Sequence, residues 1–159
     1  MEFKISDVES LIKKQNLPIT LDEAWKFFSD PRNLGKITPP SMNFKITSDL
    51  GDGKMYPGMI ITYKVHPIAG IPLTWVTEIT QVKDREFFID NQLKGPYKFW
   101  HHQHFFREVP GGVEMTDILH YAVPFGFFGR FLEKLFIRKK VEGIFEYREE
   151  ILEKYFSRK

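Results

Sequence analysis

The clearest hydrophobic pattern lies in the C-terminal part of the chain. From Phe127 to Lys159 the sequence contains no proline, and apolar residues recur at steps of three and four. These steps are the spacing of one face of an α-helix. At about 1.5 Å per residue, such a helix would extend roughly 45 Å. Because a helix with one apolar face needs a partner, we expect it to pack against a sheet.

Most of the chain between Asn43 and Tyr121 alternates apolar with polar residues, which is typical of β-strands with one buried face. Turn residues interrupt the alternation, among them Gly51-Asp52-Gly53 and Pro110-Gly111-Gly112. This pattern predicts about six antiparallel strands.

The N-terminal part predicts a strand and two short helices. Phe3 to Lys14 mix apolar with charged residues and predict the strand. Thr20 followed by Glu23 has the signature of a capping box, which begins a helix. Ser29-Asp30-Pro31 ends that helix, because proline disfavours helix in the residue before it. Pro31 to Leu34 predict a further short helical turn.

The order of these elements predicts an α+β fold. A strand, two short helices and about six antiparallel strands precede one long helix. The arrangement that buries the apolar faces of both is a curved antiparallel sheet wrapped around the long C-terminal helix.

Composition narrows the class of protein. A chain of 159 residues fits a single domain, which we expect to span residues 1–159. The net charge of +2 argues against a dedicated nucleic-acid surface. The absence of cysteine excludes disulfides and thiolate sites. Neither a signal peptide nor a membrane-spanning apolar run is apparent, so we expect a cytoplasmic protein, a monomer or a weak homodimer.

Several stretches of the chain together point to a known family. They are Pro18–Pro31, Gly70–Trp75, Gly95–Tyr97, Trp100–Phe106, Asp117–Tyr121 with Pro124, and the closing helix. These stretches resemble the START-like, or SRPBCC, superfamily of helix-grip proteins, and within it the bacterial ligand-binding proteins labelled cyclase/dehydrase-like. The resemblance covers essentially the whole chain. It implies an elongated cavity between the sheet and the C-terminal helix, with a small hydrophobic or amphipathic ligand of lipid, sterol or polyketide type.

Histidines form the first candidate site. On a strand, His102 and His104 project from one face together with Trp100 and Phe106, while His101 points the other way. His120 returns on the next strand, beside His101 or His102 depending on the register of the hairpin. Histidines that meet across strands could bind zinc. However, the sequence offers neither a nearby carboxylate motif nor a helical His-x-x-x-His, so we predict no metal and no cofactor.

Asp117 adds a carboxylate to these histidines. An aspartate can orient His102 or His104, and the pair could move protons on a bound carbonyl compound while Tyr121 donates from its hydroxyl. The alternative is that the histidine–aspartate pair satisfies buried polar groups and holds the hairpin in register. We therefore favour a ligand-binding protein over an enzyme, with a cyclase/dehydratase-type enzyme as the second hypothesis.

Aromatic residues on the strands are candidates for lining the cavity. If they face inward, a few polar groups such as Glu78, Asp90 and Gln92 would fix the head of a ligand. The alternative is a solid aromatic core with the charged residues in solvent. The residues that we predict to bind the ligand are Tyr63, Trp75, Trp100, His102, His104, Phe106, Tyr121, Phe128, Phe131 and Leu135.

A basic amphipathic segment runs from Phe125 to Lys140. Such segments can lie on anionic membranes. Because we expect its apolar side to pack against the sheet, we favour a solvated basic face, with peripheral membrane contact as the alternative.

Overall fold

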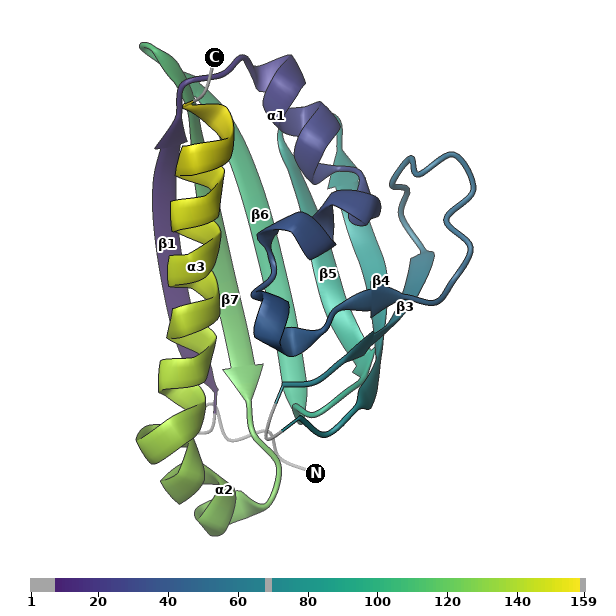
Figure 1. Ribbon diagram of the computed structural model, residues 1–159, viewed down its shortest axis with the longest axis vertical. Coiled ribbons are helices and arrows are strands. Elements are labelled where there is room, and N and C mark those ends of the chain that lie inside the picture. The colour runs from purple at the N-terminus through teal and green to yellow at the C-terminus, as the bar shows by residue number, and fades with distance from the viewer. Residues whose placement is uncertain (1–7, 68–69, 158–159) are drawn as a thin grey trace.

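The computed structural model describes residues 8–67 and 70–157. The part of the predicted first strand that lies before Val8 falls outside the described residues. Seven strands form one antiparallel sheet in the order β1-β7-β6-β5-β4-β3-β2 (Figure 1). They are β1 (Glu9–Leu17), β2 (Lys45–Ile46), β3 (Met59–Val65), β4 (Leu73–Lys83), β5 (Phe87–Lys94), β6 (Phe99–Val109) and β7 (Gly112–Ala122).

A continuous helical run follows the sheet. It consists of α2 (Gly126–Leu132), a π-helical turn (Glu133–Ile137) and α3 (Arg138–Phe156), and it is 31 residues long. In Figure 1, α3 lies along β1 and β7 across one face of the sheet. The predicted α+β fold, a curved antiparallel sheet around a long C-terminal helix, is confirmed.

Short helices cover the remainder of that face. Helix α1 (Leu21–Phe28) begins with the predicted capping box, in which the Thr20 side chain accepts from the Glu23 amide and the Glu23 carboxylate accepts from the Thr20 amide. Two 3₁₀ helices follow, at Pro31–Ile37 and Pro40–Met42.

Three buried clusters form the core. The largest joins α1 to strand residues and to the end of α3, for example through Phe28, Phe106 and Leu152. A second lies on β3 and β4, and a third joins β7 to α3. Members of all three clusters line one cavity, so the interior is hollow between the clusters.

Helix α2 differs from the prediction. We expected its apolar side to pack against the sheet, but Phe127 is 80% exposed and Phe128 65% exposed. The chain leaves β7 and turns through Phe125, whose φ of 72° lies in the left-handed region. As a result, α2 lies past the end of the sheet, where none of the described strands is beneath it (Figure 1). The apolar periodicity therefore predicted the helical conformation of α2 correctly, but it predicted the burial of the apolar side of α2 wrongly.

Gly129 and Gly143 offer a matched test of this geometry. A Cβ on Gly129 would lie 1.8 Å from the Pro124 carbonyl oxygen, whereas a Cβ on Gly143 would meet no atom within 4 Å. We expect Gly129→Ala to lower the free energy of unfolding by about 1–3 kcal/mol or more through overpacking. Gly143→Ala should raise it by roughly 0.5–1 kcal/mol, because glycine is unfavourable within a helix. Urea unfolding of both variants measures this, and a similar shift in both would contradict the close packing of α2 on Pro124.

Candidate functional site

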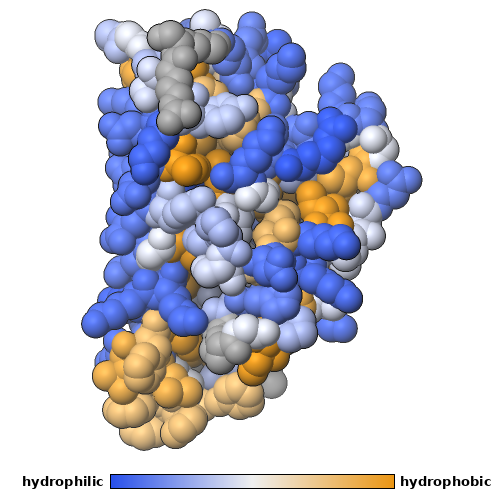
Figure 2. Space-filling model, in the orientation of Figure 1, coloured by the Kyte–Doolittle hydropathy of each residue, from blue (hydrophilic) through white to orange (hydrophobic). Residues whose placement is uncertain are grey.

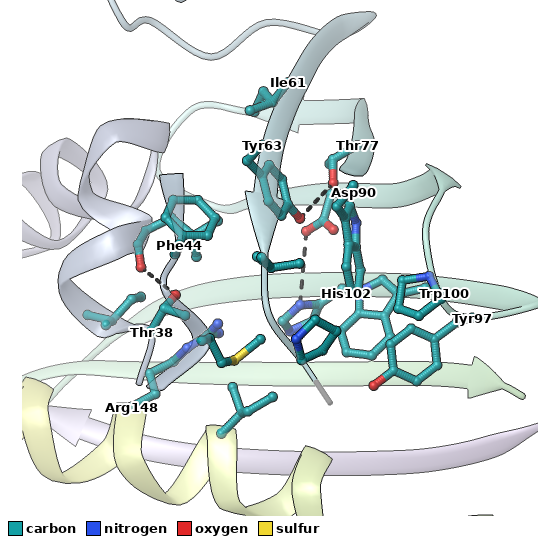
Figure 3. A pocket seen from close by; sticks show the side chains of 18 of the residues that line it. Thr38, Phe44, Ile61, Tyr63, Thr77, Asp90, Tyr97, Trp100, His102 and Arg148 are labelled. Atoms are coloured by element: carbon teal, nitrogen blue, oxygen red, sulfur yellow. Dashed lines mark hydrogen bonds and ion pairs between the residues drawn. The ribbon is translucent and has the colours of Figure 1, made fainter. Parts of the chain in front are cut away.

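The sheet and the helical run enclose a cavity of about 340 Å³. Its wall is mostly apolar and aromatic. Side chains from β3, β4, β5, β6 and α3 point into it (Figure 3). This is the general anatomy of a small-molecule site, an apolar hollow with a few polar groups.

Five of the predicted binding residues line this cavity. Strand alternation places Tyr63 and Trp75 opposite each other on β3 and β4, and their rings stack with centroids 5.9 Å apart. The Trp75 ring also meets Trp100 edge-on at 5.3 Å. His102 and His104 complete the set on β6.

The other predicted residues lie elsewhere. Phe106 packs in the core against the rings of Trp25 and Phe28 and does not line the cavity. Tyr121 is buried, and its hydroxyl donates to Glu133 at 2.9 Å, away from the cavity wall. Three residues are largely exposed because α2 and the π turn lie beyond the sheet: Phe128, Phe131 and Leu135, with 65%, 55% and 46% of their surface accessible.

A network of histidines and carboxylates forms the polar part of the site. His102 donates from Nε2, and His104 from Nδ1, to the same atom, Asp117 Oδ1, each at 2.9 Å. His104 also donates from Nε2 to Asp90 Oδ2 at 2.8 Å. Asp117 is 2% exposed and lies behind the histidines, so its role is to position them.

Strand register explains why these groups meet. His104 lies opposite Asp117 in the pairing of β6 with β7, and His102 lies opposite Asp90 in the pairing of β5 with β6. All four therefore project from the concave face. The same register pairs His120 with His101 on the outer face, so His120 does not join the site.

Arg148 is a member of the site that the sequence analysis missed. It comes from α3, is 9% exposed, lines the cavity, and places Nη1 3.8 Å from Asp117 Oδ1. Its spacing from Val141, Phe145 and Leu152 was a usable signal. These positions form the buried stripe of α3, so a charged residue at step seven from Val141 had to be buried.

Of the three polar candidates for a ligand's head group, only Asp90 reaches the cavity. Glu78 lies between the inward-facing Thr77 and Ile79 and so belongs to the outer face. Gln92 fixes the turn after β5, since its side chain donates to the Tyr97 carbonyl at 2.7 Å and accepts from the Tyr97 amide at 3.2 Å.

The network separates the pKa values of its members. Burial alone would raise the pKa of Asp117, but the hydrogen bonds from both histidines hold it well below its usual value. The pKa of Asp90 is lowered for the same reasons, with His104 as its donor. Burial and the charge of His104 lower the pKa of His102. Burial acts the same way on His104, but the hydrogen bonds to Asp117 and Asp90 outweigh it and raise the pKa of His104.

The contacts and the directions of these shifts together indicate which ring nitrogens carry a proton. His104 donates from both ring nitrogens and is the charged imidazolium. His102 donates from Nε2 to Asp117 and is neutral, so its Nδ1 carries a lone pair, 4.0 Å from Asp90 Oδ2. Two carboxylates thus face one imidazolium and one guanidinium, and the charges of the network balance.

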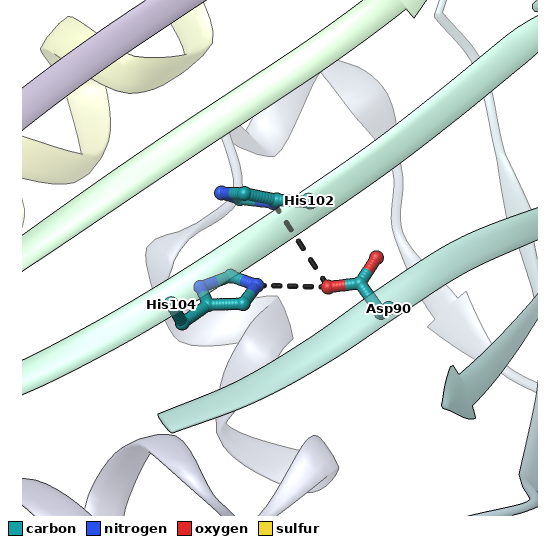
Figure 4. A group of neighbouring side chains, drawn as sticks. All are labelled: Asp90, His102 and His104. Atoms are coloured by element: carbon teal, nitrogen blue, oxygen red, sulfur yellow. Dashed lines mark hydrogen bonds and ion pairs between the residues drawn. The ribbon is translucent and has the colours of Figure 1, made fainter. Parts of the chain in front are cut away.

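Asp90, His102 and His104 also have the composition of a metal site. One ligand atom from each lies within 4.8 Å of the others (Figure 4). Zinc would need these atoms about 2.0–2.2 Å from itself. A divalent cation would displace the His104 proton and leave the balanced network with one excess positive charge, so the charge count favours the proton. That the protein holds no metal stays a prediction.

Comparisons with known proteins support the fold. No protein-family model matches the sequence, and no curated protein matches it. Protein CV1439 from Chromobacterium violaceum has a similar structure, with a TM-score of 0.70, 10% identity, and 95% of this chain and 99% of that chain covered. Major latex-like protein 151 from Panax ginseng gives a TM-score of 0.67 at 13% identity, covering 94% and 98%. Protein Ms6760 from Mycobacterium smegmatis gives 0.63 at 18%, covering 92% and 96%.

At these identities the likeness concerns the fold alone. The major latex-like neighbour agrees with the helix-grip fold that the resemblance implied. Among the described residues, no helix combines the length and hydrophobicity that a bilayer span requires. The family and the cytoplasmic location stay predictions.

The His104 assignment predicts a pH dependence. A pKa that is raised on folding stabilises the protein at pH values below about 6.5, and this stabilisation is lost as the pH rises through the pKa of the folded state. Each unit of that increase corresponds to about 1.4 kcal/mol. We therefore expect the free energy of unfolding of the native protein to fall above neutral pH by more than that of His104→Gln. Urea unfolding across the pH range measures the difference.

His120→Gln is the matched control, because His120 lies on the outer face and is hydrogen-bonded to Ser10. Its pH profile should run parallel to that of the native protein. Parallel profiles for His104→Gln as well would show that His104 is not the charged histidine.

Proposed function

We propose that the protein binds a small amphipathic ligand in the cavity, with the apolar part of the ligand against the aromatic wall. One observation carries this proposal. Two of the buried residues that line the cavity have a side-chain N–H group without a hydrogen-bond partner among the described residues. These groups are Nε1 of Trp75 and Nε of Arg148. A buried donor without a partner costs about 1–3 kcal/mol, so an acceptor supplied by a ligand would relieve that cost.

The size of the cavity favours a compact ligand. About 340 Å³ lies at the lower end of the range for small-molecule sites, roughly 300–1,000 Å³. A single chain or a fused ring system suits this volume. The ligand needs at least one acceptor, such as a carbonyl or carboxylate oxygen, to meet the two unpaired donors.

A second candidate function is proton-transfer catalysis of the cyclase/dehydratase type. The observation that favours it is the opposite direction of the two histidine pKa shifts, which places a neutral base, His102, beside a charged acid, His104. Pairs of groups whose environments push their pKa values apart are the usual arrangement for acid–base chemistry. Tyr121 has no role in this second candidate function, because its hydroxyl donates a hydrogen bond to Glu133 and does not face the cavity.

Native mass spectrometry of the freshly purified protein, followed by organic extraction, tests the binding proposal. We expect a stoichiometric adduct whose extract contains an apolar compound with a carbonyl or carboxylate oxygen. With that compound in hand, Trp75→Phe should weaken binding by about 1 kcal/mol, or roughly fivefold in Kd, because it removes the donor and keeps an aromatic ring.

Trp100→Phe is the matched control, since Trp100 also lines the cavity but is not among the residues with a buried unpaired nitrogen. It should alter Kd less than Trp75→Phe does. If the protein carries no adduct and binds no acceptor-bearing apolar compound from a screened panel, the proposal is wrong.

The enzyme hypothesis has its own test. Turnover of hydroxyketone or polyketide-like substrates should fall by about 10²-fold or more in His102→Asn, which removes the proposed base, and in His104→Ala, which removes the acid. His101→Asn is the control on the outer face, where the His101 ring contacts the Asn91 side chain. Equal activity in all variants would exclude a role for the network in catalysis.

A further inference from the structure

Helix α2 and its flanks carry an unusual concentration of exposed phenylalanines. Figure 2 shows apolar side chains gathered over the end of the molecule that α2 occupies in Figure 1. A contiguous apolar surface of this kind usually marks a binding site for a protein or a membrane. The aromatic patch comprises Phe125 and Phe127 (80% exposed each), Phe128 (65%), Phe136 (61%), Phe131 (55%) and Leu135 (46%).

Cations flank the aromatic patch. Lys134 and Lys139 are exposed, and the neighbouring cations of the segment are Arg130, Arg138 and Lys140. The one acidic residue between Pro124 and Lys140 is Glu133, which is 3% exposed and bonded to Tyr121 and Arg138. The segment that carries the aromatic patch is therefore basic, with five cations against Glu133, although Arg138 is also paired with Glu9 and the net charge of the whole chain is only +2.

This charge selects the occupant. In a symmetric dimer that buried the aromatic patch, the basic flank of one copy would lie against the basic flank of the other. An anionic bilayer surface attracts such a flank, by about 1 kcal/mol for each lysine or arginine near it. Phenylalanine side chains with basic neighbours are also the composition of helices that lie in the membrane interface.

The aromatic patch adjoins the cavity. Phe125 belongs to the patch and also lines the cavity, as do Gly129 and Leu132 from α2 itself. A bilayer that covered the patch would therefore lie directly beside the part of the cavity wall that α2 and Phe125 form.

We infer that the aromatic patch docks the protein onto anionic membranes, and that the ligand passes between the bilayer and the cavity at α2. The membrane contact stands on the exposed surface alone. Only the transfer of the ligand rests on the proposed function, and the two are measured separately.

Vesicle co-sedimentation of the whole protein tests the docking. We expect binding to vesicles of equimolar phosphatidylcholine and phosphatidylglycerol, and much weaker binding to vesicles of phosphatidylcholine alone. Added salt should weaken the binding, because it screens exposed charges.

Two variants separate the contributions. Phe127→Ser/Phe128→Ser should weaken binding to the anionic vesicles by about tenfold or more, the effect of withholding two aromatic side chains from an apolar phase. Lys134→Glu/Lys139→Glu should weaken it by a similar factor. Because all four side chains are exposed, both variants should keep the stability of the native protein.

Each control carries one change of the same kind, apolar to serine or lysine to glutamate, away from the aromatic patch. Ile12→Ser removes an apolar side chain that is 61% exposed on β1, and Lys26→Glu reverses an exposed charge on α1, at the far end of the molecule (Figure 1). Both should bind vesicles as the native protein does.

Several outcomes would overturn the inference. These are no binding to anionic vesicles, equal binding by Phe127→Ser/Phe128→Ser, or a dimer in solution that this variant splits. Trp75→Phe, which alters the cavity only, should keep full vesicle binding, so failure of the ligand proposal and failure of the docking proposal are distinguishable.

Discussion

The polar network in the interior depends on the contacts that the Asp117 carboxylate makes with His102, His104 and Arg148. This carboxylate is buried, yet the hydrogen bonds from His102 and His104 keep it ionised, and Arg148 approaches it from α3. One atom thereby links β7 to β6 and to the helix, and through His104 to Asp90 on β5. Removal of one partner from such a buried group costs about 3–5 kcal/mol, because the remaining charge is left uncompensated. The network forms the main polar part of the cavity wall, which is otherwise mostly apolar.

Much of the fold could be predicted from the sequence because its signals are local. Alternation on the strands, the capping box at Thr20 and the periodicity after Phe127 each reflect one element and its solvent exposure. Strand alternation also placed His102 and His104 on one face, and the Pro110-Gly111-Gly112 hairpin brought Asp117 to them. These contacts depend on a register that a tight hairpin fixes.

The site residues that were predicted wrongly depend on how helices and strands are placed relative to one another in space. The spacing of Phe128, Phe131 and Leu135 gives a helical face, but not that α2 lies past the end of the sheet. Phe106 faces inward as expected, yet α1 fills the space in front of it. Arg148 was not predicted as a site residue, although its position in the buried stripe of α3 indicates burial. For Arg148, the position in the helical stripe predicts burial correctly, whereas the charge of the side chain predicts exposure wrongly.

The position of β1 in the sheet has a consequence for how the chain folds. Among the described strands, β1 pairs with β7 alone, so Ser10 must come together with His120, 110 residues away in sequence. Helix α3 then packs beside this strand, where the Gln15 side chain donates to the Glu149 carbonyl at 2.8 Å. During synthesis β1 is therefore made before the other strands and stays without its partner until β7 has been made. The entropy of closing so long a loop is lost before the stabilising contacts between β1 and β7 form, which favours slow folding. Incomplete chains would also expose the unpaired edge of β1.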